Sequence, residues 1–322
     1  MKLTVIVPTY RRPQDLANCL EGLKKQTRLA DQIIVTVRDI DTQTWTFLET
    51  FNPETLPLNI ITVTASGVIA ALNMALDSAQ GDIISITDDD AVPRPEWLAR
   101  IEAHFLSDDR VGGVGGRDFV YRNNQLKEGS RKVVGRLQWF GRVIGNHNFG
   151  VGEAREVDVL KGVNMSFRRK AIGDKHFDTR MRGTSSQIHY EIEFCLALKR
   201  AGWKLIYDPN IQVDHYQGQR FDEDKRNQFN ELAMFNIVHN KTLAVLDYLS
   251  PIQRSIFVFW AILVGTRGER GLIQWLRFLP TEGKVAGQKF LVSIRGHWQG
   301  WQTWQQSKQS SPSIETLTQH KS

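Results

Sequence analysis

Cysteine is scarce in this sequence, because only Cys19 and Cys195 occur among its 322 residues. Two cysteines cannot form a disulfide framework, and so low a number is typical of a reducing compartment. The first ten residues, Met1–Tyr10, contain an apolar run that is too short for a secretory signal and that Pro8 interrupts. We therefore expect a cytoplasmic protein.

Long apolar runs are absent as well. The longest one, Ile256–Gly265, has ten residues, whereas a helix needs roughly 20 apolar residues to span a bilayer. No internal repeat is visible, which argues against a repeat architecture. With 41% hydrophobic and 24% charged residues, the 322-residue chain has the composition of a globular protein with one large or two ordinary domains.

Positive charge is in excess. The formal net charge is +6 and the pI is about 9.3, which suits anionic partners such as nucleotides, phospholipid head groups or nucleic acid without choosing among them. Pro251–Trp304 holds seven Lys or Arg against two acids, and five of the nine Trp. Basic, Trp-rich helices often lie in a membrane interface, which predicts that residues 256–304 dock on anionic lipid at the inner face of a membrane. A helical subdomain that packs these aromatic side chains on a core is the other interpretation, and both remain open.

The first hundred residues alternate between strand-like and helix-like segments. Four β-branched runs lie at residues 3–8, 32–37, 58–64 and 82–87, and segments with helical spacing separate them. This order predicts an α/β fold with a parallel sheet covered by helices on both faces. Ligands of such sheets bind outside the carboxyl ends of the strands. Three segments follow predicted strands and should meet at one edge, namely Pro8–Pro13, Asp39 and Asp88–Asp90.

Three adjacent carboxylates, Asp88–Asp90, directly follow the apolar run that ends at Thr87. Successive side chains of an extended segment point to opposite sides, so Asp88 and Asp90 can share a direction that Asp89 does not. Hard cations such as Mg²⁺ take a few carboxylates together with substrate phosphates. An Asp-rich turn that caps the following helix explains the same residues, and neither interpretation is excluded.

Four further candidates have an ordinary explanation beside a functional one. Asp39 can accept a hydrogen bond from a nucleobase or be a surface turn residue, and the two arginines of Pro8–Pro13 can meet a phosphate or belong to an ordinary loop. Glu191 and Glu193 lie near the start of a predicted helix, where acids are commonly dipole partners. They lie about 200° apart around the helix axis, so only one of them can face a site. His215 follows a short predicted strand and can be a ligand or an ordinary core residue.

These pieces together resemble family-2 glycosyltransferases. The motifs VIVPTYRR, Asp39, SGVIAALNMALDSAQGDIISITDDD, KGVNMSFRR and YEIEFCLALKRAGWKLIYDPNIQVDH follow the order and spacing of that family over roughly residues 3–216. The resemblance implies a GT-A type fold, with a Rossmann-like central sheet and flanking helices. It also implies inverting transfer of a hexosyl group from a nucleotide-diphospho-sugar, most often UDP-linked, to an acceptor hydroxyl in polysaccharide or cell-surface glycan synthesis.

The same resemblance divides the chain. Residues 1–220 would form the GT-A domain, with a nucleotide half over about 1–105 and an acceptor half over about 106–220. Residues 221–306 would form a C-terminal helical extension, in keeping with the helical pattern beyond about Arg220. Residues 307–322 are polar with a Ser/Pro cluster and predict a disordered tail.

Site residues can be carried over by position. The resemblance implies Asp90 as the direct ligand of Mn²⁺ or Mg²⁺, Asp88 near the ribose and the metal, and His215 near the metal or the diphosphate. Glu191 takes the position of the catalytic base. The implied donor-binding positions are Pro8, Thr9, Tyr10, Arg12, Asp39, Gly67, Asn73, Asp88 and Asp89.

Three residues depart from the family pattern. Tyr190 replaces the first acid of an acidic pair whose second member is usually Asp rather than Glu191. Leu72 stands where an Arg often precedes Asn73, and Arg38 stands where a second Asp is frequent. The first departure bears on the assignment of the base, and the second removes a cationic contact to the nucleotide.

Two other functional classes remain open at this point. One is a nucleotidyltransferase, which would be expected to carry a Gly-, Arg- and Lys-rich phosphate loop where this chain has PTYRRP. The other is a non-catalytic module that binds nucleotide-sugars, an option that Tyr190 raises. The expected partners are a nucleotide-diphospho-sugar donor, a glycan or lipid-linked acceptor and an anionic membrane surface, and we expect no nucleic-acid partner.

Overall fold

The computed structural model describes residues 1–54, 56–123, 125–225 and 228–310. Its strands are β1 (Leu3–Thr9), β2 (Gln32–Arg38), β3 (Leu58–Val63), β4 (Ile83–Ile86), β5 (Ala91–Pro93), β6 (Val111–Arg122), β7 (Gln125–Leu126), β8 (Arg136–Leu137), β9 (Val143–Ile144), β10 (Arg155–Val157), β11 (Met165–Arg168) and β12 (Lys204–His215). Its helices are α1 (Pro13–Lys24), α2 (Thr42–Thr50), α3 (Val68–Ser78), α4 (Trp97–Ser107), α5 (Arg169–Ile172), α6 (Tyr190–Arg200), α7 (Glu231–Leu246), α8 (Pro251–Leu263), α9 (Leu272–Glu282), α10 (Lys284–Ser310) and the short 3₁₀ helix η1 (His147–Phe149).

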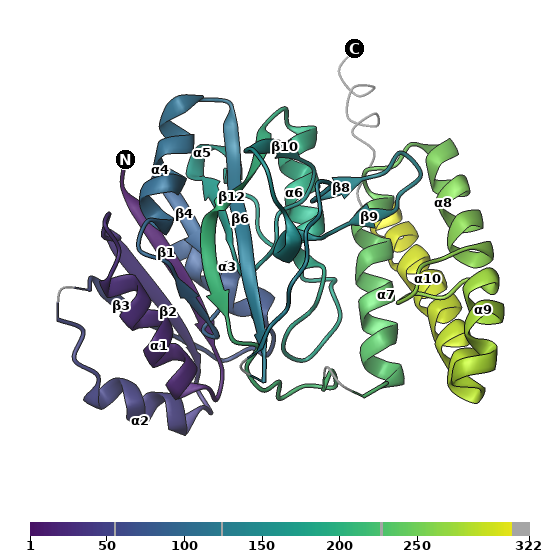
Figure 1. Cartoon of the computed structure of the whole chain (residues 1–322), viewed down its shortest axis with the longest axis horizontal. Helices are drawn as coiled ribbons and strands as arrows, with labels where there is room; N and C mark the ends of the chain where they lie inside the picture. The colour runs from purple at the N-terminus through teal and green to yellow at the C-terminus, as the bar shows by residue number, and fades with distance from the viewer. Residues whose placement is uncertain (55, 124, 226–227, 311–322) are drawn as a thin grey trace, which may run out of the picture.

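A mixed ten-stranded sheet runs through the centre of the molecule (Figure 1). Eight strands follow the order β10-β12-β6-β11-β4-β1-β2-β3, while β5 pairs with β12 and β7 pairs with β6. Strands β1 to β4 are parallel where they pair, with Val5 opposite Ile33 and Ile6 opposite Ile86. The four β-branched runs therefore form the predicted strands. Strand β11 is antiparallel to both β4 and β6 and joins this parallel half to the rest of the sheet.

Both faces of the sheet are buried. Val5 and Val7 pack with α1 and α4 on one face, while Ile6 and Ile34 pack with α3 and α6 on the other. Strands that are buried on two faces have continuous hydrophobic sequences. The four strands could therefore be predicted from the sequence. The predicted α/β fold is confirmed.

The pairing of β5 with β12 brings two distant segments to one edge. Strand β5 begins directly after Asp90 and runs antiparallel to the end of β12, with Ala91 opposite His215. Strand β12 also pairs in parallel with β6, which carries Asp118. Acidic residues and a histidine that are far apart in the chain therefore lie beside one another.

Side-chain caps fix the starts of several helices. The carboxylate of Asp41 accepts a hydrogen bond from Thr44 N at the start of α2 and another from Arg11 N, which ties the β1–α1 loop to α2. Ser250 and Gln253 form a capping box around α8, and Pro251 occupies its first turn.

Helices α7 to α10 stand together at the end of the molecule opposite β3 (Figure 1). The helical pattern predicted from about Arg220 begins only at Glu231. Most of α7 is buried between α6 and α10, and Trp301 and Trp304 of α10 pack against the same core as α6. Trp304 Nε1 also donates to Asp247 Oδ1 over 3.1 Å. Helices α7 and α10 therefore pack on the core beside the sheet, as the packing interpretation expects.

The end of the chain differs in part from its prediction. Helix α10 continues to Ser310, so the first four residues of the predicted tail 307–322 are helical. The remainder of that tail lies outside the described residues, and the division at residues 220 and 306 stays a prediction. Among the described helices, none combines the length and the apolar character that crossing a membrane requires.

Candidate functional site

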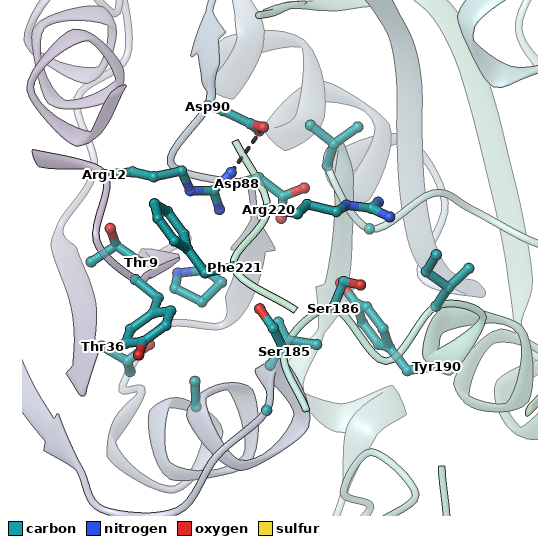
Figure 2. A pocket seen from close by; sticks show the side chains of 18 of the residues that line it. Thr9, Arg12, Thr36, Asp88, Asp90, Ser185, Ser186, Tyr190, Arg220 and Phe221 are labelled. Carbon is teal, nitrogen blue, oxygen red and sulfur yellow. Dashed lines mark hydrogen bonds and ion pairs between the residues drawn. The ribbon is translucent and has the colours of Figure 1, made fainter. Parts of the chain in front are cut away.

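A cavity of about 610 Å³ opens at the carboxyl ends of the parallel strands (Figure 2). Strands β1, β2 and β3, helices α3 and α6 and the segments after β4 and β12 all contribute to its lining. It therefore has the position expected of a ligand site in an α/β sheet. Nine residues proposed from the sequence line it: Pro8, Thr9, Tyr10, Arg12, Gly67, Asp88, Asp90, Glu191 and His215.

The three carboxylates of the acidic motif point in different directions, as the alternation along an extended segment predicts. One ligand atom each of Asp88, Asp90 and His215 lies within 4.8 Å of the others, and Asp90 Oδ1 is 3.3 Å from His215 Nε2. Asp89 is fully buried, and its Oδ2 accepts a hydrogen bond of 2.7 Å from Thr9 Oγ1. Asp88 and Asp90 thus border the cavity, while Asp89 anchors the end of β1.

Arg12 supplies much of the positive charge that these carboxylates need. Its guanidinium forms ion pairs with Asp89 and, over 3.0 Å, with Asp90 Oδ2, as Figure 2 shows for Asp90. Gly218 N donates a further hydrogen bond of 2.7 Å to Asp90 Oδ2. The turn is not a simple helix cap, because α4 begins only at Trp97 and Glu96 stands at its N-cap. Arg12 lies at the cavity edge, but its charge is directed at the acids.

Two further charged residues, Asp118 and Lys161, lie behind His215. Its Nδ1 is 3.4 Å from Asp118 Oδ2, and Asp118 is itself fully buried and paired with Lys161. Burial opposes protonation of His215, but the charges of Asp90 and Asp118 outweigh it and raise the pKa of the imidazole to about 9. Burial would raise the pKa of Asp118, yet Lys161 and His215 together hold it at about 2.

Glu191 and Glu193 point in different directions, as their helical spacing requires. Glu191 lines the cavity, whereas Glu193 Oε1 accepts a hydrogen bond of 2.8 Å from the hydroxyl of Tyr248. Burial raises the pKa of Glu191 to about 7, against backbone hydrogen bonds and the charge of Lys161. Glu191 is therefore a carboxylate that can bind and release a proton near neutral pH.

The loop 182–188 forms another wall of the cavity, and helix α7 holds both of its ends. Asn240 Oδ1 accepts a hydrogen bond of 2.7 Å from Arg182 N, and Asn240 Nδ2 donates to Arg182 O (2.8 Å) and Ile188 O (3.1 Å). Asn240 is fully buried. The predicted acceptor side is thus fixed by a residue of the helical extension.

Gly67 permits a close approach between this loop and α3. Its φ is +100°, and a Cβ there would lie 2.3 Å from Gln187 Oε1. The same Gln187 oxygen accepts a hydrogen bond of 3.0 Å from Ile69 N, and Ser185 O accepts one of 2.7 Å from Val68 N. The N-terminal amides of α3 are therefore engaged by the loop.

Three proposed donor-binding residues lie outside the lining, namely Asp39, Asn73 and the buried Asp89. Asp39 is exposed and accepts a hydrogen bond of 3.0 Å from Ile40 N, although its neighbours Arg38 and Ile40 do line the cavity. Asn73 binds the backbone N–H and C=O of Phe177, so it holds the segment before the loop. Leu72 is fully buried in the core, where no cationic contact to a nucleotide is made.

Lys161, Arg220 and Phe221 are among the lining residues that were not predicted from the sequence. Lys161 opens the motif KGVNMSFRR, and Arg220 and Phe221 follow His215 closely. Phe221 meets Tyr10 edge-on with ring centroids 6.1 Å apart, so the segment after β12 folds back over the nucleotide side of the cavity. The signal for Arg220 was its place just after a predicted strand end. It was overlooked because a domain boundary was placed there.

Comparisons with known proteins agree with this geometry. The sequence model described as "Glycosyl transferase family 2" matches residues 4–174, which is more than half of the chain. The "Glucosyl-dolichyl phosphate glucuronosyltransferase" of Haloferax volcanii is 22% identical over 261 residues, which cover 78% of this chain and 79% of that protein.

Solved structures share the fold. A crystal structure of S. aureus TarS 1-349 in complex with UDP-GlcNAc has a TM-score of 0.56 at 15% identity and covers 95% of this chain and 92% of that one. The mannosyltransferase PcManGT from Pyrobaculum calidifontis, in complex with GDP-Man and Mn²⁺, has a TM-score of 0.52 at 15% identity and covers 95% and 88%. The fold, the contents of the cavity and the family match together establish that the chain belongs to glycosyl transferase family 2 and is a glycosyltransferase.

Proposed function

We propose that the protein is an inverting glycosyltransferase that moves a hexosyl group from a UDP-linked sugar to an acceptor hydroxyl in polysaccharide or cell-surface glycan synthesis. The observation that carries this proposal is that Glu191 lines the same cavity as Asp88, Asp90 and His215. A base and a group of residues suited to a diphosphate that line one cavity fit a single displacement between them.

The residues at the acidic motif fit a divalent cation. Two carboxylates and an imidazole with ligand atoms within 4.8 Å of one another suit Mn²⁺ or Mg²⁺ completed by phosphate oxygens. The PcManGT structure contains Mn²⁺ together with GDP-Man, which supports the same cofactor class here. When bound, such an ion would neutralise the charge that develops on the leaving diphosphate.

The chain's own residues would perform the proton transfer and the orientation. The acceptor oxygen forms a bond to the anomeric carbon while the bond from that carbon to the diphosphate oxygen breaks, and Glu191 takes the acceptor proton. General-base help of this kind is typically worth about 10²–10⁴-fold. The sugar would pass through an oxocarbenium-like state, as in glycoside hydrolysis.

The donor and acceptor classes follow from the two sides of the cavity. Pro8–Tyr10 would contact the nucleotide, and Asp39, at the cavity mouth, would accept a hydrogen bond from the uracil N–H. TarS has been crystallised with UDP-GlcNAc, which supports a UDP-linked donor. A glycan or lipid-linked acceptor is supported by the Haloferax relative, whose name refers to a dolichyl phosphate-linked sugar.

Paired substitutions of the two acids test the proposal. Glu191→Gln should lower the release of UDP from a UDP-sugar by at least about 10²-fold at saturating donor with Mn²⁺, with donor affinity nearly intact. Glu193→Gln is the matched control, because Gln still accepts the hydrogen bond from Tyr248. The reverse ranking would show that the base is misassigned, and donor affinity without turnover in the unsubstituted protein would indicate a binding module. A product with the donor's anomeric configuration would exclude inversion.

A further inference from the structure

The outer surface of α8 and α9 is apolar and exposed. Helix α9 contains no buried residue, and Leu276 at its centre is 54% exposed. On α8, Ile252 is 74% and Phe259 67% exposed. We call the following set the α8–α9 face: Ile252, Phe259, Ile262, Leu263, Leu272, Ile273, Leu276 and Leu279.

Helical periodicity places these residues on one side of each helix. Phe259 follows Ile252 by seven residues, and Ile262 follows Phe259 by three. The buried residues of α8, Phe257 and Ala261, lie on the opposite side. On α9 the exposed apolar positions recur with intervals of one, three and three residues. The exposure is therefore organised as stripes, unlike the scattered single side chains that are usual on protein surfaces.

The charge exposed on helices α8 to α10 up to residue 298 has one sign. Residues 251–298 contain two acids, and neither is exposed. Glu269 is buried and paired with Lys241, and Glu282 is paired with Arg270 and Lys289. The exposed charged residues of this stretch are all basic: Arg267, Arg277, Lys284 and Arg295.

From this arrangement we propose that the α8–α9 face docks on the surface of an anionic lipid bilayer. Apolar side chains would enter the region between head groups and acyl chains, while the surrounding Arg and Lys side chains meet anionic head groups. The docking segment is narrower than residues 256–304, since Trp301 and Trp304 pack on the core.

Charge favours a membrane over a second copy of the chain. A twofold dimer through this face would bring Arg277 of α9 and Arg267 of the α8–α9 connection close to their copies, without an exposed acid in residues 251–298 to pair with them. An anionic bilayer supplies the complementary charge. The proposal stands independently of the transferase proposal, because no residue of the α8–α9 face lines the cavity.

Vesicle flotation with the full chain tests this docking. The protein should float with vesicles of phosphatidylcholine mixed with phosphatidylglycerol, and much less with phosphatidylcholine alone. Each basic residue near such a surface contributes about fivefold to affinity at low salt, so four of them multiply to about 10²–10³-fold. Binding should fall as salt rises, because salt screens exposed charges. Arg277→Gln should weaken it about fivefold and Leu276→Glu by at least about tenfold.

Matched controls separate docking from folding and catalysis. Leu106→Glu changes another exposed leucine, 66% accessible on α4 outside this face, and should leave vesicle binding unchanged. UDP release from a UDP-sugar should be the same in Leu276→Glu as in the unsubstituted protein, which shows an intact fold. Absence of flotation, or equal losses from Leu276→Glu and Leu106→Glu, would overturn the proposal. So would a dimer in sedimentation equilibrium that Leu276→Glu dissociates, because the face would then bind a second copy.

Discussion

Removing the side chain of Asn240 should uncouple the loop 182–188 from the helical extension. Asn240→Ala deletes one acceptor and two donor interactions with Arg182 and Ile188, all within 3.1 Å. A hydrogen bond of this kind contributes about 1 kcal/mol net, so three give a loss of about 3 kcal/mol in the free energy of unfolding. Because Asn240 is fully buried, the backbone groups left behind gain little from bulk water.

The catalytic effect should exceed the effect on donor binding. The loop carries Ser185, Ser186 and Ile188 into the cavity and leads into the first turn of α6, where Glu191 lies. A misplacement of about 1 Å can cost about 10²-fold in rate. We expect turnover to fall by at least about tenfold, with UDP affinity within a few-fold, because Thr9 and Asp90 are held by hydrogen bonds with Asp89, Arg12 and Gly218 rather than by the loop.

Urea denaturation and calorimetric titration with UDP measure the two effects. Thr242→Val is the control, because Thr242 is buried in the same helix and bonds Val238 O and His297 but makes no hydrogen bond to the loop. It should lower stability by about 2 kcal/mol and leave turnover per folded molecule unchanged. Equal losses of turnover in the two variants, or an Asn240→Ala variant of full stability, would refute the reasoning.

Four further outcomes follow from the site. Since Glu191 must be ionised to accept a proton and its pKa is raised to about 7, turnover at pH 6 should be about tenfold below that at pH 8; a flat profile of kcat would contradict its role. Asp90→Ala, or excess EDTA, should abolish turnover and weaken donor binding while circular dichroism stays native, and activity that persists in EDTA would exclude metal dependence. Asp39→Ala should weaken UDP binding more than it slows the bound complex, so wild-type affinity in calorimetry would remove Asp39 from base recognition. Gly67→Ala should lower the melting temperature and turnover together, because a Cβ would lie 2.3 Å from Gln187 Oε1, and an unchanged melting temperature would show that the loop can move aside.

The parallel half of the sheet could be predicted because its strands are buried on both faces. Residues such as Val5 and Ile6 face opposite helix layers, so the run is apolar throughout and its end is marked by a change to polar residues. The alternating directions of the Asp88, Asp89 and Asp90 side chains could also be predicted, because they depend only on the extended backbone of these three residues. The pairing of His215 with Asp90 was not derivable from pattern, because it depends on β5 lying beside the end of β12.

Other features could not be predicted from the sequence, because they depend on packing between segments that are far apart in the chain. Nothing local shows that Arg12 turns to Asp89 and Asp90, since an arginine before a helix is equally suited to a phosphate. Periodicity also cannot tell a buried helix face from an exposed one. The stripe of α8 that contains Phe257 and the stripe that contains Phe259 are both apolar, and only the structure shows that the second is exposed.

The burial of α7 against α6 affects whether the N-terminal part of the chain can fold without the C-terminal helices. Leu243, Val245 and Leu246 belong to the same core as Phe194, and Asn240 holds the loop beside the cavity. A fragment that stops near residue 220 would expose this core and release the loop, so the GT-A portion should not behave as a module that can be excised. Chimaeras designed to change the acceptor should therefore exchange α6, the loop 182–188 and α7 as one unit.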